Sequence, residues 1–414
     1  MAKRILLLLL VCFTAFAQIT NVNLGTTIND GTGDTLRTAF SKVNTNITWL
    51  ASQLAYVTNL GSFRLVPSFS EAVVSVSSPS AYQVFQRSSD NSGTITVTAT
   101  VSGPTGTTVQ ARFKGGSWQT VGTSSIYGVA TGTITGTMGQ GAVDVRISGG
   151  STYTTVTPVS IGDVFAIWGQ SNGSGRLTSN QTFTNTAIVA SIFGNDYTWK
   201  AIVDPTDSNS GQVDTVSSDS DSQMGSIWPL VADIYINETA VPVAFVQCTK
   251  GATGFSGSPS WVPGSDHFDR TTLFGSAMNR IRTVGGVKAI LWWQGEGGFD
   301  DTTGMSYITP FTNMVTAVRE EYPTLRLVPC KLQQCVGITN ERLTNGWYAI
   351  GRLWSEWTNL VYTGPTLADA PVGAANNILT EDEGTGTPYY HLKTSTNGAA
   401  AAYRWATNLV ANFE

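Results

Sequence analysis

The sequence predicts a mixed α/β protein in which a parallel-sheet domain follows a small all-β domain. Short apolar runs at 164–168, 243–246 and 289–293 alternate with helix-like stretches in the second half of the chain. That alternation is typical of strand–helix units whose strands pair in parallel. Upstream, residues 94–101 and 143–147 alternate between apolar and polar side chains with period two, which indicates strands that bury one face.

Charge is scarce in this chain. Asp, Glu, Lys and Arg make up 12% of the 414 residues, about half of the roughly 25% usual for soluble domains. Apolar residues at 41% are enough to form a sizeable core, which excludes charge-driven disorder. The balance of 23 Lys and Arg against 28 Asp and Glu offers no basic surface for nucleic acid, so we expect no nucleic-acid partner.

Residues 1–17 have the features of a secretory signal peptide. Lys3 and Arg4 precede an apolar run at 5–13, and small residues at 15–17 form a cleavage signal. The run is about half of the roughly 20 apolar residues that a transmembrane helix needs, and no other segment is long and apolar enough. We therefore expect a secreted, extracellular protein without a membrane span.

Residues 18–60 form a separate segment with a helix expected from Thr35. Its apolar residues recur at alternating four- and three-residue steps: Leu36, Phe40, Val43, Ile47, Leu50 and Leu54. The helix either packs on the next domain or forms a homo-oligomer, a dimer or trimer, through residues 35–55. The wording of residues 23–44 also resembles a segment near the start of phage virion and tail proteins.

Residues 61–160 are expected to form a small β-sandwich, because turn signals such as those at 103–106 separate the alternating runs. The region 161–414 is expected to hold the α/β domain. Its helices are predicted around four stretches: 226–236, 269–284, 306–322 and 397–412. In a parallel α/β sheet the reactive groups lie at the carboxyl ends of the strands.

The cysteines point to structure and not to metal binding. Cys330 and Cys335 are close enough in sequence for a small disulfide loop in an oxidising compartment. Cys248 ends an apolar run and is expected to be a buried thiol. The chain has only two histidines and no Cys/His spacing of a metal site, so we expect neither a metal nor an organic cofactor.

A candidate nucleophile ends the first strand of the α/β region. Residues 163–168 lead into Gly-Gln-Ser-Asn-Gly at 169–173, which raises the hydroxyl of Ser171 above the carboxyl edge of the sheet. A serine nucleophile needs a general base, ordinarily histidine. His391, just before the last predicted helix, is the favoured base, and His267 lies in a polar loop where solvent or substrate contact is expected.

Two more strand ends carry candidate site residues. Gln294 follows the strand at 289–293, and its side-chain amide suits an oxyanion hole. Glu296 either supports the site and orients substrate or is a solvated loop carboxylate. Gly251 follows the strand at 243–248, where its backbone N–H can approach a reacting carbonyl oxygen.

The order of these motifs resembles the sialate O-acetylesterase family of SGNH hydrolases, which are GDSL-type carbohydrate esterases. The blocks are Gly-Gln-Ser-Asn, Lys-Gly-Ala-Thr, Trp-Trp-Gln-Gly-Glu and a near-terminal His-Leu, spread over about 161–412. The resemblance implies a three-layer domain with Ser171 as nucleophile and His391 as base. It also implies an oxyanion hole of Gly251, Gln294 and the Ser171 N–H, with Asn172 supporting the site.

The chain differs from the family pattern at the acid that would orient His391. The family has an aspartate three residues before the histidine, where this chain has Pro388. Of the upstream carboxylates at 381–383, Asp382 is our choice. A Ser–His dyad oriented by a backbone carbonyl, or by Glu296, is the alternative.

These observations predict a serine esterase, a carboxylic ester hydrolase that removes O-acetyl groups from acetylated polysaccharide or sialic acid. It would act outside the cell or on a virion. The alternative is a non-catalytic glycan-binding or structural phage tail protein on an esterase-like scaffold. Four tryptophans are expected to lie mostly in the core, although they could serve as platforms for sugar rings: Trp168, Trp261, Trp292 and Trp293.

Overall fold

The fold is given by a computed structural model of the chain. It describes the following residues: 38, 42–44, 74–219, 224–296, 301–335, 339–368, 378 and 390–414. The chain divides into two compact units, 1–70 and 71–414. In the first unit the described residues, Thr38 and 42–44, are helical. The predicted signal peptide, the rest of the 18–60 segment and its oligomer contact lie outside the described residues.

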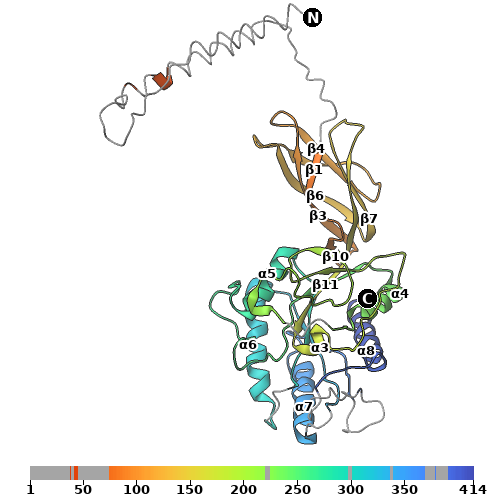
Figure 1. Ribbon diagram of the computed structural model, residues 1–414, viewed down its shortest axis with the longest axis vertical. Coiled ribbons are helices and arrows are strands. Elements are labelled where there is room, and N and C mark those ends of the chain that lie inside the picture. Colours follow the sequence, from red (N-terminus) through yellow and green to blue (C-terminus); the bar gives the residue numbers. More distant parts are fainter. Residues whose placement is uncertain are drawn as a thin grey trace, which may run out of the picture. The chain divides into compact units, whose positions relative to one another are not determined.

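The second unit begins with the predicted β-sandwich (Figure 1). One sheet is antiparallel, in the order β1 (Val74–Ser78), β3 (Ser92–Val101) and β6 (Val129–Thr137). The other contains β4 (Thr108–Phe113), β5 (Gln119–Thr123), β7 (Gly139–Ile147) and the first half of β8 (Thr154–Gly169), with β2 (Val84–Gln86) alongside β8. Alternate residues of β3 are buried, as the period-two pattern predicts.

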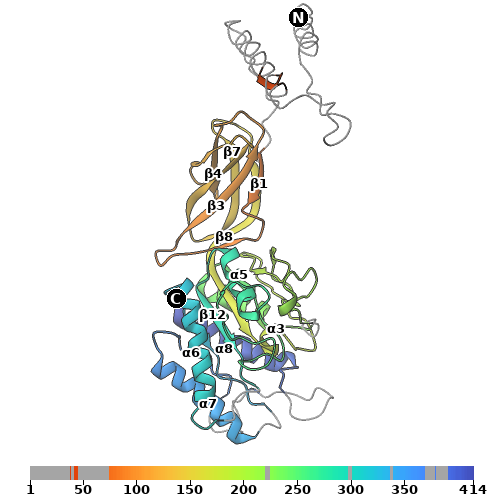
Figure 2. The ribbon, with the colours of Figure 1, turned by 90° about the vertical axis from the view of Figure 1, so that its left-hand side faces the viewer.

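Strand β8 belongs to both sheets, and Figure 2 shows it running from the sandwich toward the short helix α3 (Ser171–Ser174). Exposed and half-buried residues alternate up to 158, and every residue from 159 to 169 is buried. The change follows from the surroundings, because the second half lies in a parallel sheet that is covered on both faces.

The α/β sheet has the order β10-β9-β11-β8-β12-β13. Its other strands are β9 (Ser191–Phe193), β10 (Trp199–Ala201), β11 (Val243–Gln247), β12 (Ala289–Trp293) and β13 (Leu327–Pro329). All neighbours pair in parallel except the edge strand β10. The carboxyl ends of β8, β11 and β12 therefore meet at one edge, as the apolar runs predict.

Helices cover both faces of this sheet (Figure 1). Helices α4 (Trp228–Thr239) and α8 (Ser395–Phe413) pack together on one face, and α5 (Leu273–Val284) and α6 (Met305–Glu321) lie on the other. The predicted three-layer α/β fold is confirmed. No helix in the described ranges is long and apolar enough to cross a membrane.

Two sequence-based expectations need correction or addition. Cys330 and Cys335 are free, buried thiols and not a disulfide. Their sulfur atoms have different neighbours: the Cys330 Sγ lies 3.4 Å from the Lys331 carbonyl oxygen and the Cys335 Sγ 3.8 Å from the Gln333 amide nitrogen. Cys248 is a core thiol as expected. Helix α7 (Asn340–Glu356), which packs on α6, was not predicted.

Candidate active site

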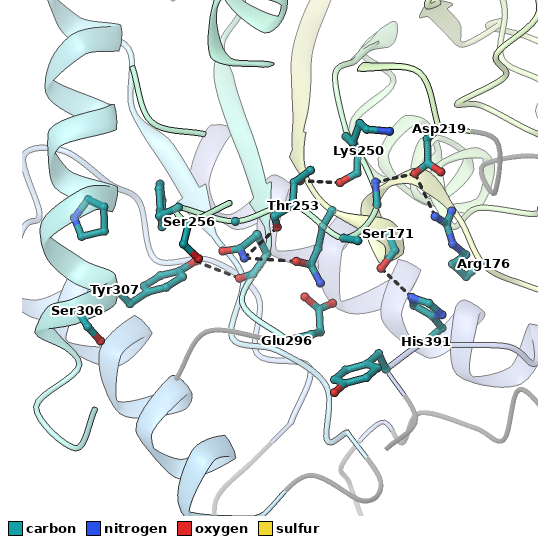
Figure 3. Close-up of a pocket in the computed structure, with 18 of the residues that line it drawn as sticks. Ser171, Arg176, Asp219, Lys250, Thr253, Ser256, Glu296, Ser306, Tyr307 and His391 are labelled. Carbon is teal, nitrogen blue, oxygen red and sulfur yellow. Dashed lines mark hydrogen bonds and ion pairs between the residues drawn. The ribbon is translucent and has the colours of Figure 1, made fainter. Parts of the chain in front are cut away.

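A cavity of about 1070 Å³ opens at the carboxyl edge of the parallel sheet (Figure 3). Its wall comes from the segments after β8, β11 and β12, from α6 and from the segment before α8. The candidate residues Ser171, Gly251, Gln294, Glu296 and His391 all line it. The fold thus brings together side chains that are far apart in the sequence.

The backbone before Ser171 turns sharply and requires glycine. Gly169 ends β8 with φ of +125°, and a Cβ there would lie 2.0 Å from the carbonyl oxygen of Trp293 on the neighbouring strand. L-residues rarely adopt this conformation, and the close approach leaves no room for a side chain. Ser171 follows at the start of α3 and is buried at the cavity wall.

Ser171 and His391 form a hydrogen-bonded pair across 220 residues of sequence. The Ser171 Oγ and the His391 Nε2 are 2.8 Å apart, within the range of a nucleophile and its general base. His267 lies elsewhere: its ring nitrogens are 3.2 Å from Glu321 Oε1 and 3.6 Å from Glu320 Oε2 on α6. It is not among the cavity-lining residues and its side chain is 14% exposed, so of the two expected contacts, solvent or substrate, the structure favours solvent.

Asn172 holds the segment that carries His391. Its Nδ2 donates to the carbonyl oxygen of Tyr390 at 2.9 Å, and its Oδ1 accepts from the N–H of Leu392 at 3.1 Å. These bonds fix the main chain on both sides of His391. The same Nδ2 donates to Glu296 Oε1 at 2.7 Å, which joins the nucleophile turn to the segment after β12.

Glu296 is a buried member of this network and not a solvated loop carboxylate. Its Oε1 also accepts from Gln333 Nε2 at 3.2 Å, and Gln333 Nε2 lies 3.3 Å from the Tyr390 carbonyl oxygen. The indole of Trp293 donates to Gln333 Oε1 at 3.1 Å. Burial raises the pKa of Glu296 despite the hydrogen bond from Asn172, which favours the neutral carboxyl.

Gln333 escaped the sequence reasoning because it has no titratable group and matches no motif. Its position, just after the strand β13, was the signal that could have found it, since residues at that edge reach the site. The Glu296 carboxyl group accepts hydrogen bonds from the side chains of Asn172 and Gln333. These contacts favour support of the His391 segment over direct orientation of the imidazole.

Two predicted oxyanion donors, Gln294 and Gly251, line the cavity, and both lie within hydrogen-bonding distance of other groups of the protein. The Gln294 Nε2 lies 3.3 Å from both Gln170 Oε1 and the Thr253 carbonyl oxygen. The N–H of Gly251 donates to Asp219 Oδ2 at 2.6 Å. A Cβ at Gly251 would lie 2.6 Å from that same oxygen, so a larger residue here would displace the Asp219 carboxylate.

Asp219 was also missed from the sequence, as was its partner Arg176. The Arg176 Nη2 lies 3.0 Å from Asp219 Oδ2, and both side chains are more than nine-tenths buried. Arg176 Nη1 donates to the Gly175 carbonyl oxygen at 2.8 Å. This ion pair closes the side of the cavity next to Gly251 (Figure 3).

A second network of buried hydrogen bonds holds α3 in place. Ser174 Oγ donates to Thr249 Oγ1 at 2.9 Å, and Thr249 Oγ1 donates to Asp207 Oδ2 at 2.9 Å. The indole of Trp228 donates to the Gly173 carbonyl oxygen at 2.7 Å. These bonds tie the turn that bears the candidate nucleophile to β11 and α4, and so restrict its movement.

Comparison with protein families gives a match to part of the chain. Residues 161–352 match the family model described as carbohydrate esterase, sialic acid-specific acetylesterase. This stretch is similar to the esterase domain of that family. The predicted resemblance to the sialate O-acetylesterases and the predicted class, a carboxylic ester hydrolase, are thereby confirmed. A comparison with curated protein sequences finds no match.

Three solved structures are similar to the chain at low identity. One is a carbohydrate acetylesterase from Xanthomonas citri, 18% identical over 80% of this chain and 73% of that one, with a TM-score of 0.48. A protein from Arabidopsis thaliana is 17% identical over 61% of this chain and 99% of that one, with a TM-score of 0.42. A family two carbohydrate esterase from Clostridium thermocellum is 13% identical over 82% and 98%, with a TM-score of 0.32.

Two further expectations for the esterase domain have different outcomes. Asp382, like its neighbours at 381 and 383, lies outside the described residues, so its role as orienting acid stays a prediction. The four tryptophans expected in the core are fully buried: Trp168, Trp261, Trp292 and Trp293. They cannot form sugar platforms. Among the described residues, no group of three or more His, Cys, Asp or Glu side chains could hold a metal ion.

Proposed function

We propose that the esterase domain is a serine esterase that removes O-acetyl groups from carbohydrate. The observation that carries the proposal is the 2.8 Å contact between Ser171 Oγ and His391 Nε2 in the wall of the cavity. Both residues lie at the carboxyl edge of the sheet, where α/β folds place their reactive groups. The family match over 161–352 supports an acetylated sugar as substrate.

The reaction follows from the positions of these two side chains. His391 Nε2 accepts the Ser171 Oγ proton while that oxygen attacks the acetyl carbonyl carbon. The tetrahedral intermediate collapses, the sugar oxygen leaves with the proton from His391, and Ser171 keeps the acetyl group as an ester. Water then attacks this ester with His391 as base, which releases acetate and restores the Ser171 hydroxyl.

The negative charge on the tetrahedral intermediate needs donors. We assign this role to the Gln294 side-chain amide and to the backbone N–H groups of Gly251 and Ser171. Removing one such donor costs about 10²–10³-fold in kcat. Without substrate, the Gly251 N–H donates to the Asp219 carboxylate. In the reaction the acyl oxygen replaces this carboxylate as the acceptor of that hydrogen bond.

We assign the orientation of the His391 imidazole to Asp382. A series of Asp382→Asn, Glu381→Gln and Glu383→Gln variants tests the choice. The variant that removes the true orienting acid is expected to lose about 10⁴-fold in kcat, because the imidazole then adopts the wrong tautomer. The other two variants keep their activity. Equal activity of all three would favour the Ser–His dyad.

Acetate release tests the proposed activity directly. The wild type is expected to release acetate from p-nitrophenyl acetate and from acetylated polysaccharide, and Ser171→Ala to lose at least about 10³-fold in kcat. Ser355→Ala, on the exposed side of α7, is the matched control and keeps its activity. Glycan binding by the wild type without any acetate release would contradict the proposal and favour a binding protein.

We also propose that the enzyme acts outside the cell or on a virion. The support is the signal-peptide pattern of residues 1–17 and the phage-like wording of residues 23–44. Protein recovered from the culture medium is expected to begin at Gln18. Retention of the full-length chain in the cytoplasm would contradict this location.

A further inference from the structure

Two aromatic rings of the β-sandwich lie outside its core. Trp118 comes just before β5 and Tyr153 just before β8, and their ring centroids are 6.1 Å apart at an interplanar angle of 60°. Neither belongs to the hydrophobic core that the described residues of the sandwich form. Tyr153 is 51% exposed and Trp118 is half-buried. Large rings that gather at the surface indicate a binding surface.

Two arginine side chains stack on this aromatic pair. The guanidinium carbon of Arg146 lies 3.9 Å from the centre of the Trp118 ring, and that of Arg112 lies 4.5 Å from it. Arg112 also lies 5.3 Å from the centre of the Tyr153 ring. At these distances the face of each ring attracts the cation. We refer to these four side chains as the Trp118 cluster.

Hydrogen bonds to the sheet fix both guanidinium groups. Arg112 Nε lies 2.8 Å from Asp144 Oδ2. Arg146 donates from Nε and Nη2 to Gln110 Oε1 at 3.2 and 3.1 Å, and from Nη1 to the Gly150 carbonyl oxygen at 3.1 Å. The acceptors of Arg146 are neutral, so these bonds hold its position without neutralising its charge. The cluster is therefore a preorganised surface that presents rings and a positive charge together.

The sandwich is cationic in an acidic chain. Residues 74–160 contain four cationic and two acidic side chains, a net charge of +2 in a chain whose net charge is −5: Arg87, Arg112, Lys114, Arg146, Asp90 and Asp144. Arg87 forms a salt bridge with Asp163 of the α/β sheet. The remaining cations belong to the sandwich itself, and two of the three are in the Trp118 cluster. Charge complementarity thus favours an anionic partner at this cluster.

An acidic polysaccharide fits this surface better than a nucleic acid does. A pyranose ring has an apolar C–H face that packs on an aromatic ring, and a guanidinium binds a carboxylate through paired N–H groups. Exposed hydroxyl side chains at Ser117, Ser151 and Thr152 adjoin the two rings in the sequence. Nucleic-acid binding commonly uses about 6–10 phosphate contacts, more than the cations of the sandwich can supply.

We propose that the Trp118 cluster binds polysaccharide chains that carry carboxylate groups. The site is separate from the catalytic cavity, because none of its four side chains lines that cavity. Sugar rings pack on Trp118 and Tyr153, and a carboxylate binds beside Arg146. Strand β8 continues from the sandwich into the α/β sheet, so a polymer held at the cluster is kept at high local concentration near the esterase domain. The binding itself does not depend on the deacetylase activity proposed above.

Polygalacturonate without acetyl groups is the probe, and calorimetric titration of the full chain gives its Kd. The wild type is expected to bind it, and Trp118→Ala to bind at least about tenfold more weakly. Tyr127→Ala, which removes an 82% exposed ring elsewhere on the sandwich, is the matched control and keeps its Kd. The fully methyl-esterified polymer is expected to bind more weakly than the free acid, with a difference that shrinks as salt is added. Arg146→Gln is expected to reduce this difference.

A wild type that does not bind polygalacturonate overturns the proposal, as does a folded Trp118→Ala variant with the wild-type Kd. If Trp118→Ala does not fold, Tyr153→Ala takes its place, with a severalfold loss expected and an unchanged Kd overturning the site. Equally tight binding of single-stranded DNA, or self-association of the wild type that Trp118→Ala abolishes, also overturns the proposed partner.

Activity separates this site from the catalytic one. Trp118→Ala is expected to hydrolyse p-nitrophenyl acetate like the wild type, and to show a raised KM with unchanged kcat on acetylated polygalacturonate. An unchanged KM on the polymer overturns the role of the cluster in catalysis on polymers. Polymer binding without acetate release from any substrate contradicts the deacetylase activity and leaves the binding site supported.

Discussion

Replacing Asn172 with alanine removes two hydrogen bonds to the His391 segment and a third to Glu296, which supports that segment. The amide contacts the Tyr390 carbonyl oxygen at 2.9 Å, the Leu392 N–H at 3.1 Å and Glu296 Oε1 at 2.7 Å. Alanine makes none of these contacts. We therefore expect the imidazole to lose its fixed position beside Ser171, although neither member of that pair is changed.

The size of the effect follows from the number of bonds. A net contribution of about 1 kcal/mol for each of three bonds predicts a loss of about 3 kcal/mol in the free energy of unfolding. Asn172 is 4% exposed, so water does not readily replace the lost contacts. A displacement of the base by about 1 Å lowers kcat by about 10²-fold, with a smaller effect on KM.

The assay combines acetate release with chemical denaturation, so that activity and stability are measured on the same preparation. Asn237→Ala is the matched control, because Asn237 is exposed on α4 and accepts one hydrogen bond from Asn185. The control is expected to keep both values. A folded Asn172→Ala variant with the kcat of the wild type would refute the positioning of His391 by Asn172.

Three more predictions concern the frame of the site. In chemical denaturation, Gly169→Ala is expected to lose at least about 3 kcal/mol of unfolding free energy, because the new Cβ would meet the Trp293 carbonyl oxygen. Gly351→Ala is the control: Gly351 lies inside α7 with open space around it, and alanine there is expected to add about 0.5–1 kcal/mol of unfolding free energy. For Asp163, burial raises the pKa, but its cationic partners outweigh burial and lower it overall. Its contribution to stability is therefore present above about pH 4 and lost as pH falls through the lowered pKa, so Asp163→Asn is expected to flatten the acid part of a stability–pH curve. For Glu296, burial raises the pKa. The wild type therefore loses stability as pH rises above about 4.3, because the buried carboxyl must then ionise. In denaturation, the free energy of unfolding of Glu296→Gln is expected to exceed that of the wild type by more at pH 8 than at pH 4.

The Ser171–His391 pair proposed to react could be placed from the sequence, because strand ends and residue chemistry leave few candidates. Ser171 ends a buried strand, and the chain offers only two histidines. The carboxyl ends of parallel strands meet at one edge, which brings a segment before the last helix within reach. The structure then shows the 2.8 Å contact between Ser171 and His391.

The support of that pair could not be predicted, because it consists of contacts between distant, mostly neutral side chains. Gln333 reaches Glu296 and Tyr390 only through the packing of β13 beside β12. Asp219 accepts a hydrogen bond from the Gly251 N–H because the long connection between β10 and α4 brings it there. Neither contact leaves a local pattern in the sequence.

Local sequence distance also misled one prediction. Cys330 and Cys335 are five positions apart, which a disulfide loop permits, but the chain after β13 gives each sulfur its own buried surroundings. Helix α7 was missed although its buried residues recur at three- and four-residue steps: Leu343, Trp347, Ile350 and Leu353. That spacing is typical of one helix face.

Covalent labelling of the nucleophile tests the central claim most directly. A fluorophosphonate, which phosphonylates activated serines, is added to the protein, and residual acetate release is followed alongside peptide mapping. We expect the label on Ser171, in proportion to the loss of activity, and no label when His391 is replaced by alanine. Complete inactivation with the label on another residue, or a fully labelled Ser171 in an enzyme that still releases acetate, would contradict the assignment of Ser171 as nucleophile.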